Sequence, residues 1–344
     1  MSVSQLYDRT KQTVEFGFVL CHRFGAVTDP RNTPRADPML LLGRLDGRLH
    51  SSPCADIFLA RAQLEGAATL AGLAGVPVAV RDLQDWIAGR TPPPRASEGL
   101  NDPVSLAAVF HLALSRDEDS RDPVARATLN VLRSVLDDRV AAENWGGDDL
   151  AYFGPLWRTV REAADRPFER GGVNAVAQRV FEIAALTQGA PPGGSQVVTA
   201  DGRTLALPPR SRDRNWLIAA AVPAMLLRAD LTQRVIPSLI LLPKFLPASP
   251  EALAATMDAA LGQIAATGLR DLDRIERRAA DILETMAVTR RSRAPLLARL
   301  QLAYPGLRPK AVARLLDVTP QGARKLLAGE SQGLRPNGLR SSAD

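Results

Sequence analysis

The chain has 344 residues and a net charge of +6, and 46% of its residues are hydrophobic. That hydrophobic fraction is ordinary for a globular protein and excludes a wholly disordered chain. The two cysteines, Cys21 and Cys54, stand alone in the sequence, with no Cys-X-X-Cys or Cys/His cluster. The sequence therefore favours neither a disulfide framework nor a zinc site, and it is typical of a cytoplasmic protein.

The excess positive charge lies in the last sixth of the chain. Arginine outnumbers lysine by 39 to 4, a skew typical of a GC-rich coding sequence, so the number of arginines alone proves little. Residues 287–344, however, contain 11 basic and 3 acidic residues, whereas the rest of the chain contains 32 basic and 34 acidic ones. A coding bias would act everywhere, so this local excess indicates a surface that attracts polyanions.

No stretch of the sequence predicts a membrane segment or a secretory signal. The N-terminus has no continuous apolar run behind a basic start. The most apolar stretch, Trp216–Leu227, is too short to cross a bilayer, and charged residues follow it closely. We expect this stretch to be a buried core helix.

In chain order, an N-terminal arm (1–36) is followed by a mostly helical region (37–289). One predicted helix, within 122–143, has Val124, Leu129, Leu132 and Leu136 at three- to five-residue spacing, which is typical of one buried helical face. Asp82, Asp85 and Trp86 in another indicate helix-terminal charge and a core aromatic side chain. The predicted helices of this region lie within residues 38–52, 55–75, 80–89, 105–117, 122–143, 149–165, 173–189 and 216–227.

Only one segment has the pattern of β-strands. In Ser195–Pro209, the dipeptide Asp201-Gly202 separates two β-favouring runs, which predicts a short hairpin with a two-residue turn. Helical pattern then resumes. Ser249 and Pro250 begin a helix over 249–268, and residues 269–288 follow with an apolar stripe made of Leu272, Ile275, Ala279, Ile282 and Met286.

The stretch Pro309–Ala328 has the features of a helix-turn-helix. Its two short helices must cross steeply, so one position must be small, and Ala313 fits. Thr319-Pro320 predicts the start of the second helix, and Gly329 predicts its end. A preceding helix over Arg293–Tyr304 would complete a three-helix domain, 290–330, followed by a basic flexible tail, 331–344. The residues expected to fill the angle between the two helices are Val312, Leu316, Val318, Ala323 and Leu326.

Two residues depart from the usual pattern of this motif. Asp317 occupies the turn position that favours Gly, and Asp tolerates the left-handed backbone less well than Gly. Gly322 lies inside the second helix, at a cost of about 1 kcal/mol relative to Ala. The whole pattern nevertheless favours DNA binding over an ordinary helical hairpin with a solvated basic face.

On this geometry the candidate DNA-binding side chains point away from the core. Gln321 and Arg324 suit base edges in the major groove, because Gln can bond adenine and Arg can bond guanine. Lys325 suits a phosphate contact. The remaining candidates for DNA contact are Thr319, Arg308, Lys310, Arg314, Arg290, Arg291 and Arg293. For the basic run Arg290–Arg293, a solvated linker and a phosphate contact are equally good interpretations.

Other chemistry has little support in the sequence. The histidines are His22, His50 and His111, and none has a His, Cys or carboxylate partner at metal-ligand spacing. His111 lies on an apolar helix and is expected to be a core histidine with satisfied hydrogen bonds. There is no Walker loop and no Gly-X-Gly-X-X-Gly motif. We therefore predict no metal, no cofactor and no enzyme activity.

Three stretches carry a resemblance to a known family: residues 44–72, "VAVRDLQDW" at 78–86, and "RRSRAPLLARL" with "LDVTPQGARKLL" at 290–327. They resemble an uncharacterised bacterial family, often plasmid-borne, that joins a helical domain of unknown function to a C-terminal DNA-binding domain. We therefore predict a transcriptional regulator whose helical domain serves dimerisation or partner binding. A single helix-turn-helix has a small footprint, so the expected partners are double-stranded DNA and a second copy of the chain.

The helical domain also resembles, more distantly, the Fic fold of nucleotidyl-transferring enzymes. Glu65-Gly66 in "RAQLEGA" is similar to the Glu-Gly helix of that fold, although Arg61 stands where the family has Ser or Thr. Residues 214–229 resemble the helix that follows the Fic catalytic loop, but the His-Pro-Phe and Gly-rich loop itself is absent. The alternative to a DNA-binding regulator is a non-catalytic protein-interaction module derived from this scaffold.

Overall fold

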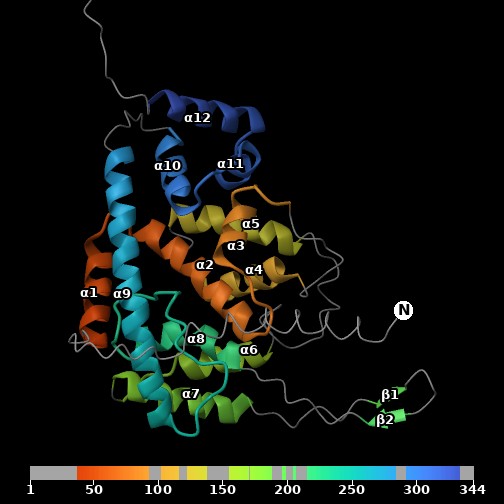
Figure 1. Ribbon diagram of the computed structural model, residues 1–344, viewed down its shortest axis with the longest axis vertical. Helices are drawn as coiled ribbons and strands as arrows, with labels where there is room; N and C mark the ends of the chain where they lie inside the picture. Colours follow the sequence, from red (N-terminus) through yellow and green to blue (C-terminus); the bar gives the residue numbers. More distant parts are fainter. Residues whose placement is uncertain are drawn as a thin grey trace, which may run out of the picture. The chain divides into compact units, whose positions relative to one another are not determined.

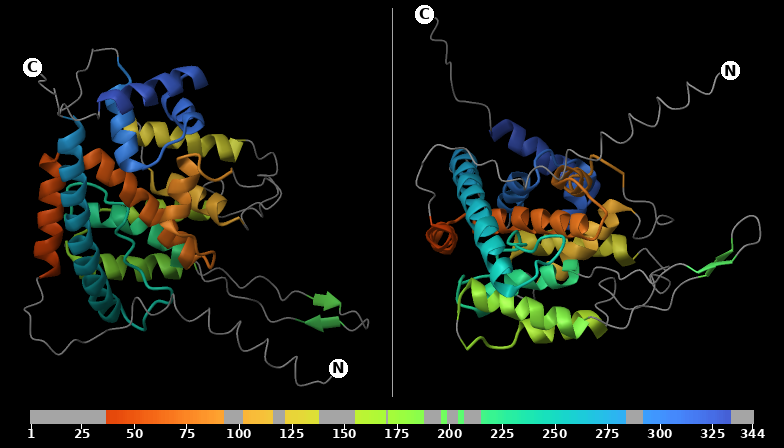
Figure 2. Two further views of the ribbon diagram at one scale, coloured as in Figure 1. Left: turned by 45° about the horizontal axis from the view of Figure 1, so that its top comes forward. Right: turned by 60° about the horizontal axis from the view of Figure 1, so that its bottom comes forward.

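The computed structural model describes residues 37–92, 102–115, 122–137, 155–169, 171–187, 196–198, 204–206, 215–283 and 292–333. Apart from one pair of short strands, the regular structure of these residues is α-helical (Figures 1 and 2). The N-terminal arm lies outside the described residues. Within the described ranges, no helix combines the length and the apolar character needed to cross a bilayer.

The helices cover most of the ranges predicted from the sequence. Those of the main body are α1 (Pro38–Ser51), α2 (Ala55–Leu73), α3 (Val80–Ile87), α4 (Pro103–Leu114), α5 (Pro123–Asp137), α6 (Pro155–Ala164), α7 (Val173–Thr187), α8 (Asn215–Arg228) and α9 (Pro250–Leu283). The last three are α10 (Ala294–Ala303), α11 (Pro309–Leu316) and α12 (Pro320–Gly333). The strands are β1 (Gln196–Val198) and β2 (Thr204–Ala206).

The long helix α9 joins the two apolar stretches that the sequence shows over 249–268 and 269–288. It runs unbroken for 34 residues, with α1 alongside it (Figure 1). Gly268 lies within this contact, where an added Cβ would come 3.0 Å from Leu45 Cδ2 and 3.3 Å from Phe58 Cζ. The glycine therefore allows close packing of the helix against its neighbours and does not mark a helix end.

Helix α2 lies at the centre of the body and contacts α4, α8 and α9. Its Gly66 has no room for a side chain, because an added Cβ would lie 2.3 Å from the carbonyl oxygen of Pro237. The same Cβ would lie 2.8 Å from Leu114 Cδ1 on α4. Gly66 is thus explained by packing alone. The buried helix expected over Trp216–Leu227 is present as α8, and Pro223 lies inside it.

The strands β1 and β2 pair in antiparallel fashion, with Val198 opposite Thr204 and Gln196 opposite Ala206. This register leaves an odd number of residues between paired positions. A two-residue turn at Asp201-Gly202 would require an even number, so that prediction does not match the register. Asp201 and Gly202 themselves lie outside the described residues.

The last three helices are joined to the body by buried contacts. The Tyr304 hydroxyl, at the end of α10, lies 2.7 Å from Thr128 Oγ1 on α5, and both side chains are buried. The Arg61 guanidinium of α2 donates to the Leu302 carbonyl at 2.6 Å. On α10, Arg299 donates to the Pro53 carbonyl and pairs with Asp56 at 3.2 Å. Helices α10 to α12 therefore share a hydrophobic core with the body.

A backbone contact completes this junction. The N–H of Arg308, just before α11, donates to the Ala88 carbonyl at 2.9 Å. Beside it, Gly89 has a φ of +72°, and an added Cβ would lie 3.1 Å from Ala311 Cβ. The end of α3 thus fixes the start of α11 through positions where only a small residue fits.

His111 differs from its prediction as a satisfied core histidine. It is 3% exposed, yet neither ring nitrogen has a hydrogen-bond partner among the described residues. Burial lowers the pKa of His111 from its ordinary value of 6.5 to about 3. The imidazole is therefore buried in its neutral form at physiological pH.

This burial predicts acid sensitivity. Above pH 6.5 neither the folded nor the unfolded chain protonates His111, whereas between pH 6.5 and about 3 only the unfolded chain does. The free energy of unfolding should therefore fall as the pH falls. By pH 5, the His111 contribution to this loss should be about 2 kcal/mol. We expect His111→Leu to lose less stability between pH 7.5 and pH 5 than wild type, measured by urea unfolding. Equal losses in the two proteins would contradict the prediction.

The Tyr304–Thr128 contact predicts an asymmetric response to substitution. Tyr304→Phe should lower the free energy of unfolding by about 1 kcal/mol, because Thr128 keeps its other hydrogen bond, at 2.9 Å, to the Val124 carbonyl. Thr128→Val should cost more, about 1–3 kcal/mol, because it leaves the Tyr304 hydroxyl buried without that partner. The double variant should cost less than the sum, as measured by thermal unfolding. Additive losses would show that the two groups are not coupled.

Candidate nucleic-acid interface

Helix α11 is buried along two adjacent stripes. Val312 and Leu316, which the sequence predicted to be buried, are 0% and 1% exposed. Ala311 and Leu315 are also buried, and sequence reasoning missed them although they repeat the same four-residue spacing. Ala311 approaches Gly89 of the body. The extra stripe thus provides a contact between α11 and the rest of the chain.

The turn between α11 and α12 is made by Asp317. Its backbone is left-handed, with φ 50° and ψ 56°, the conformation expected where the motif favours Gly. The N–H groups of Asp317 and Val318 both donate to the Ala313 carbonyl. Asp is among the few residues that tolerate this conformation, so the chain turns here without a glycine.

Thr319 caps the start of α12. The N–H of Gly322 donates to Thr319 Oγ1 at 3.1 Å, and the N–H of Ala323 donates to the Thr319 carbonyl at 2.9 Å. The N-cap predicted at Thr319-Pro320 is therefore confirmed. Gly322 leaves room at this point, because an added Cβ would lie 3.3 Å from Thr319 Oγ1.

The predicted apolar residues between α11 and α12 come together. Ala323 is fully buried, while Ala313, Val318 and Leu326 are partly buried and pack against the core. The predicted helix end at Gly329 is wrong, because α12 continues to Gly333 and so includes the first three residues of the predicted tail. Glycine inside a helix costs only about 1 kcal/mol, which neighbouring helical residues can offset.

The predicted contact residues of α12 are on its solvent side. Gln321, Arg324 and Lys325 are exposed, as is Thr319 at the N-cap. Arg308, Lys310 and Arg314, on and beside α11, are exposed as well. The five arginine and lysine side chains among these residues form no ion pair within the described part of the chain. Helix α12 lies at the top of the helical body in Figure 1.

Arg293 has an intramolecular partner. Its Nη1 donates to the Leu316 carbonyl at 2.7 Å, the last carbonyl of α11. A cation at a helix C-terminus is favourable, so Arg293 stabilises the packing of α10 against α11. Arg290 and Arg291 lie outside the described residues.

Many helix starts carry an acidic residue. Asp37, Asp102 and Asp122 cap α1, α4 and α5, and acidic residues lie in the first turns of α2, α3 and α9. The first turns of α6, α7 and α8 have none, and neither do those of α10, α11 and α12. Arg293 and Arg308 are the N-cap residues of α10 and α11, and neither side chain makes a cap hydrogen bond. The absence of acidic residues is therefore not particular to the last three helices.

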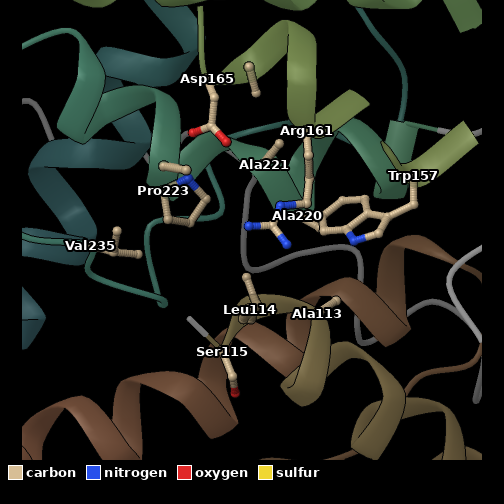
Figure 3. A pocket seen from close by; sticks show the side chains of 12 residues that line it. Ala113, Leu114, Ser115, Trp157, Arg161, Asp165, Ala220, Ala221, Pro223 and Val235 are labelled. Carbon is tan, nitrogen blue, oxygen red and sulfur yellow. The ribbon is translucent and has the colours of Figure 1, made fainter. Parts of the chain in front are cut away.

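A small cavity between α4, α6 and α8 is a poor candidate for a catalytic site (Figure 3). Arg161 and Trp157 border it together with Asp165 and Ser115, but its volume of ≈ 20 Å³ is room for about one water molecule. Among the described residues, no group of three or more His, Cys, Asp and Glu side chains could hold a metal ion.

The Glu-Gly pair lies on α2, where Gly66 approaches Leu114 of the cavity lining. Glu65 is partly buried, and burial, reinforced by Asp271, raises the pKa of its carboxyl group. Burial lowers the pKa of Arg61, one turn earlier. Arg61, which occupies the Ser/Thr position of the Fic pattern, bonds the Leu302 carbonyl and so has a structural role.

The cap on α12 makes a prediction about local stability. Thr319→Ala should lower the local stability of the first turn of α12 by about 1 kcal/mol, because the Gly322 N–H loses its acceptor. Hydrogen exchange of the first α12 amides should therefore become roughly fivefold faster. Thr319→Ser keeps the hydroxyl and is the matched control. Equal exchange rates in the alanine and serine variants would show that the cap does not stabilise α12.

No family model, curated protein or solved structure matches this chain. The candidate interface is therefore defined by its own geometry. Two short helices joined at Asp317 leave Gln321, Arg324 and Lys325 exposed, with Arg308, Lys310 and Arg314 nearby in the sequence.

Proposed function

We propose that this chain binds double-stranded DNA through a helix-turn-helix formed by α11 and α12, with α10 as the third helix. Transcriptional regulation is the proposed use. The supporting observation is the exposed side of α12, where Arg324 and Lys325 lie beside Gln321 and form no ion pair with any described residue, on a helix that packs through its opposite side.

The chemistry of these side chains suits the two parts of a DNA duplex. Arg324 and Gln321 have the bidentate geometry that reads guanine and adenine in the major groove. Lys325 and the α11 residues Lys310 and Arg314 provide charges for the phosphates. The Thr319 hydroxyl can still donate a hydrogen bond, because its interaction with Gly322 N–H uses the oxygen as acceptor. Arg308 adds a charge at the start of α11, which suits a phosphate there.

The helical body is proposed to bring two copies of the chain together. One helix-turn-helix has a small footprint, and regulators of this kind usually read two half-sites through a two-fold axis. The proposal includes no enzyme activity, since the sequence lacks the catalytic loop of the Fic enzymes that the body resembles. A Fic-derived interaction module, with an acidic protein as partner of the basic end, is the competing proposal.

DNA binding is tested by selecting fragments from a random duplex pool with the full-length chain and measuring affinity by fluorescence anisotropy. Arg324→Ala should lower the affinity for the selected site about tenfold or more, and relax the sequence preference at one base pair. Lys325→Ala should lower the affinity for all sequences alike, and it should reduce the slope of log affinity against log salt concentration by about 1. Both effects follow from the loss of one base or phosphate contact.

Arg158→Ala is the matched control, because Arg158 is exposed and belongs to α6. Figure 1 shows α6 on the other side of the helical body from α12. It should leave DNA affinity unchanged. Failure of any fragment to be enriched would reject the proposal. So would an equal loss of affinity in the Arg158→Ala and Arg324→Ala variants, because binding would then follow total charge and not the α12 surface.

A further inference from the structure

A second cavity, of ≈ 450 Å³, opens between the C-terminal part of α9 and the segment that joins α10 to α11. That volume lies in the range of small-molecule sites, about 300–1,000 Å³. It is more than twenty times the volume of the cavity in Figure 3, so it can accept more than water. Neither the proposed DNA contacts nor the resemblance to known families uses it.

The floor of this cavity is built from apolar side chains held in place by the body. Leu302 and Leu307 are buried beneath it, and Ile282 is partly buried at its side. The Leu302 backbone is fixed by the bond from Arg61. Gly306, with a φ of +79°, makes the turn that separates the two leucines, and an added Cβ there would lie 2.8 Å from Arg90 Nη1. A preformed apolar floor of this kind favours binding, because little has to be ordered.

The polar rim of the cavity has a cation that has no partner among the described residues. Arg278 lines it from α9, is exposed, and forms no hydrogen bond or ion pair with any described residue. Gln301 lines the rim from α10, and Asp281 lies one turn beyond Arg278. A single guanidinium group matches a ligand with one negative charge. It suits a polyphosphate poorly, because the further charges of that ligand would stay uncompensated.

We propose that this cavity binds an amphipathic monoanion, an aromatic or aliphatic carboxylic acid, with its carboxylate on Arg278 and its apolar body on Leu302 and Leu307. An arginine–carboxylate contact supplies charge-assisted hydrogen bonds, and the leucines remove the apolar part of the ligand from water. This site does not depend on the proposed function. Its test needs no DNA, so either proposal can fail without the other.

The probe is 1-anilinonaphthalene-8-sulfonate, an apolar ring system with one anionic group, titrated into the full-length chain. We expect saturable fluorescence enhancement with one site per chain. Arg278→Met should weaken it about tenfold or more, because the charged contact is lost while the length of the side chain is kept. Arg277→Met is the control, since Arg277 is a neighbouring exposed arginine whose Nε bonds the Asp273 carbonyl, away from the cavity lining.

Charge selectivity is tested with two competitors of one ring size. 1-Naphthoate should displace the probe, whereas 1-naphthylmethylammonium should not. Absence of saturable binding, equal affinities in the Arg278→Met and wild-type chains, or displacement by the ammonium compound alone would overturn the proposal. Unchanged thermal unfolding of Arg278→Met, whose side chain is exposed, would show that any loss is local to the site.

Discussion

The junction at Tyr304 is the constraint on which the arrangement of the last three helices depends. A phenol hydroxyl in the core needs a partner, and Thr128 of α5 provides it across 176 residues of sequence. Arg61 and Arg299 add charged donors aimed at backbone carbonyls on either side of the junction. Because these bonds fix α10, they also fix where α11 begins and which side of α12 meets solvent.

Local signals made much of the candidate interface predictable from sequence. The Thr319 cap, the buried Val312 and Leu316, and the exposure of Gln321 and Arg324 all follow from spacing within about twenty residues. Helix-capping and amphipathic patterns are short-range effects, so a sequence displays them directly. The charge excess after residue 287 was equally visible.

The missed features depend on neighbours that are distant in sequence. Gly268 looked like a helix end because its reason, the approach of Leu45 and Phe58, lies on other helices. The partner of Arg293 is the Leu316 carbonyl, and no local pattern distinguishes that role from a phosphate contact. His111 was expected to have hydrogen bonds, but its apolar helix is packed on all sides, and no described group bonds its ring. The cavity beside Arg278 forms only when α9 meets the α10–α11 segment.

If the chain binds DNA as proposed, the close approach of Gly89 to Ala311 has a consequence for the spacing of its half-sites. With Arg308 N–H bonded to the Ala88 carbonyl at the same place, α11 has no free linker to the body. Two copies paired through their bodies would therefore hold both α12 helices at one separation. Major grooves on one side of a duplex recur every 10–10.5 base pairs, about 34 Å. Inserting half a helical turn of DNA between two half-sites would turn the second major groove to the opposite side of the duplex. Because α11 and α12 are fixed to the body, the second copy could not move its α12 to reach that groove.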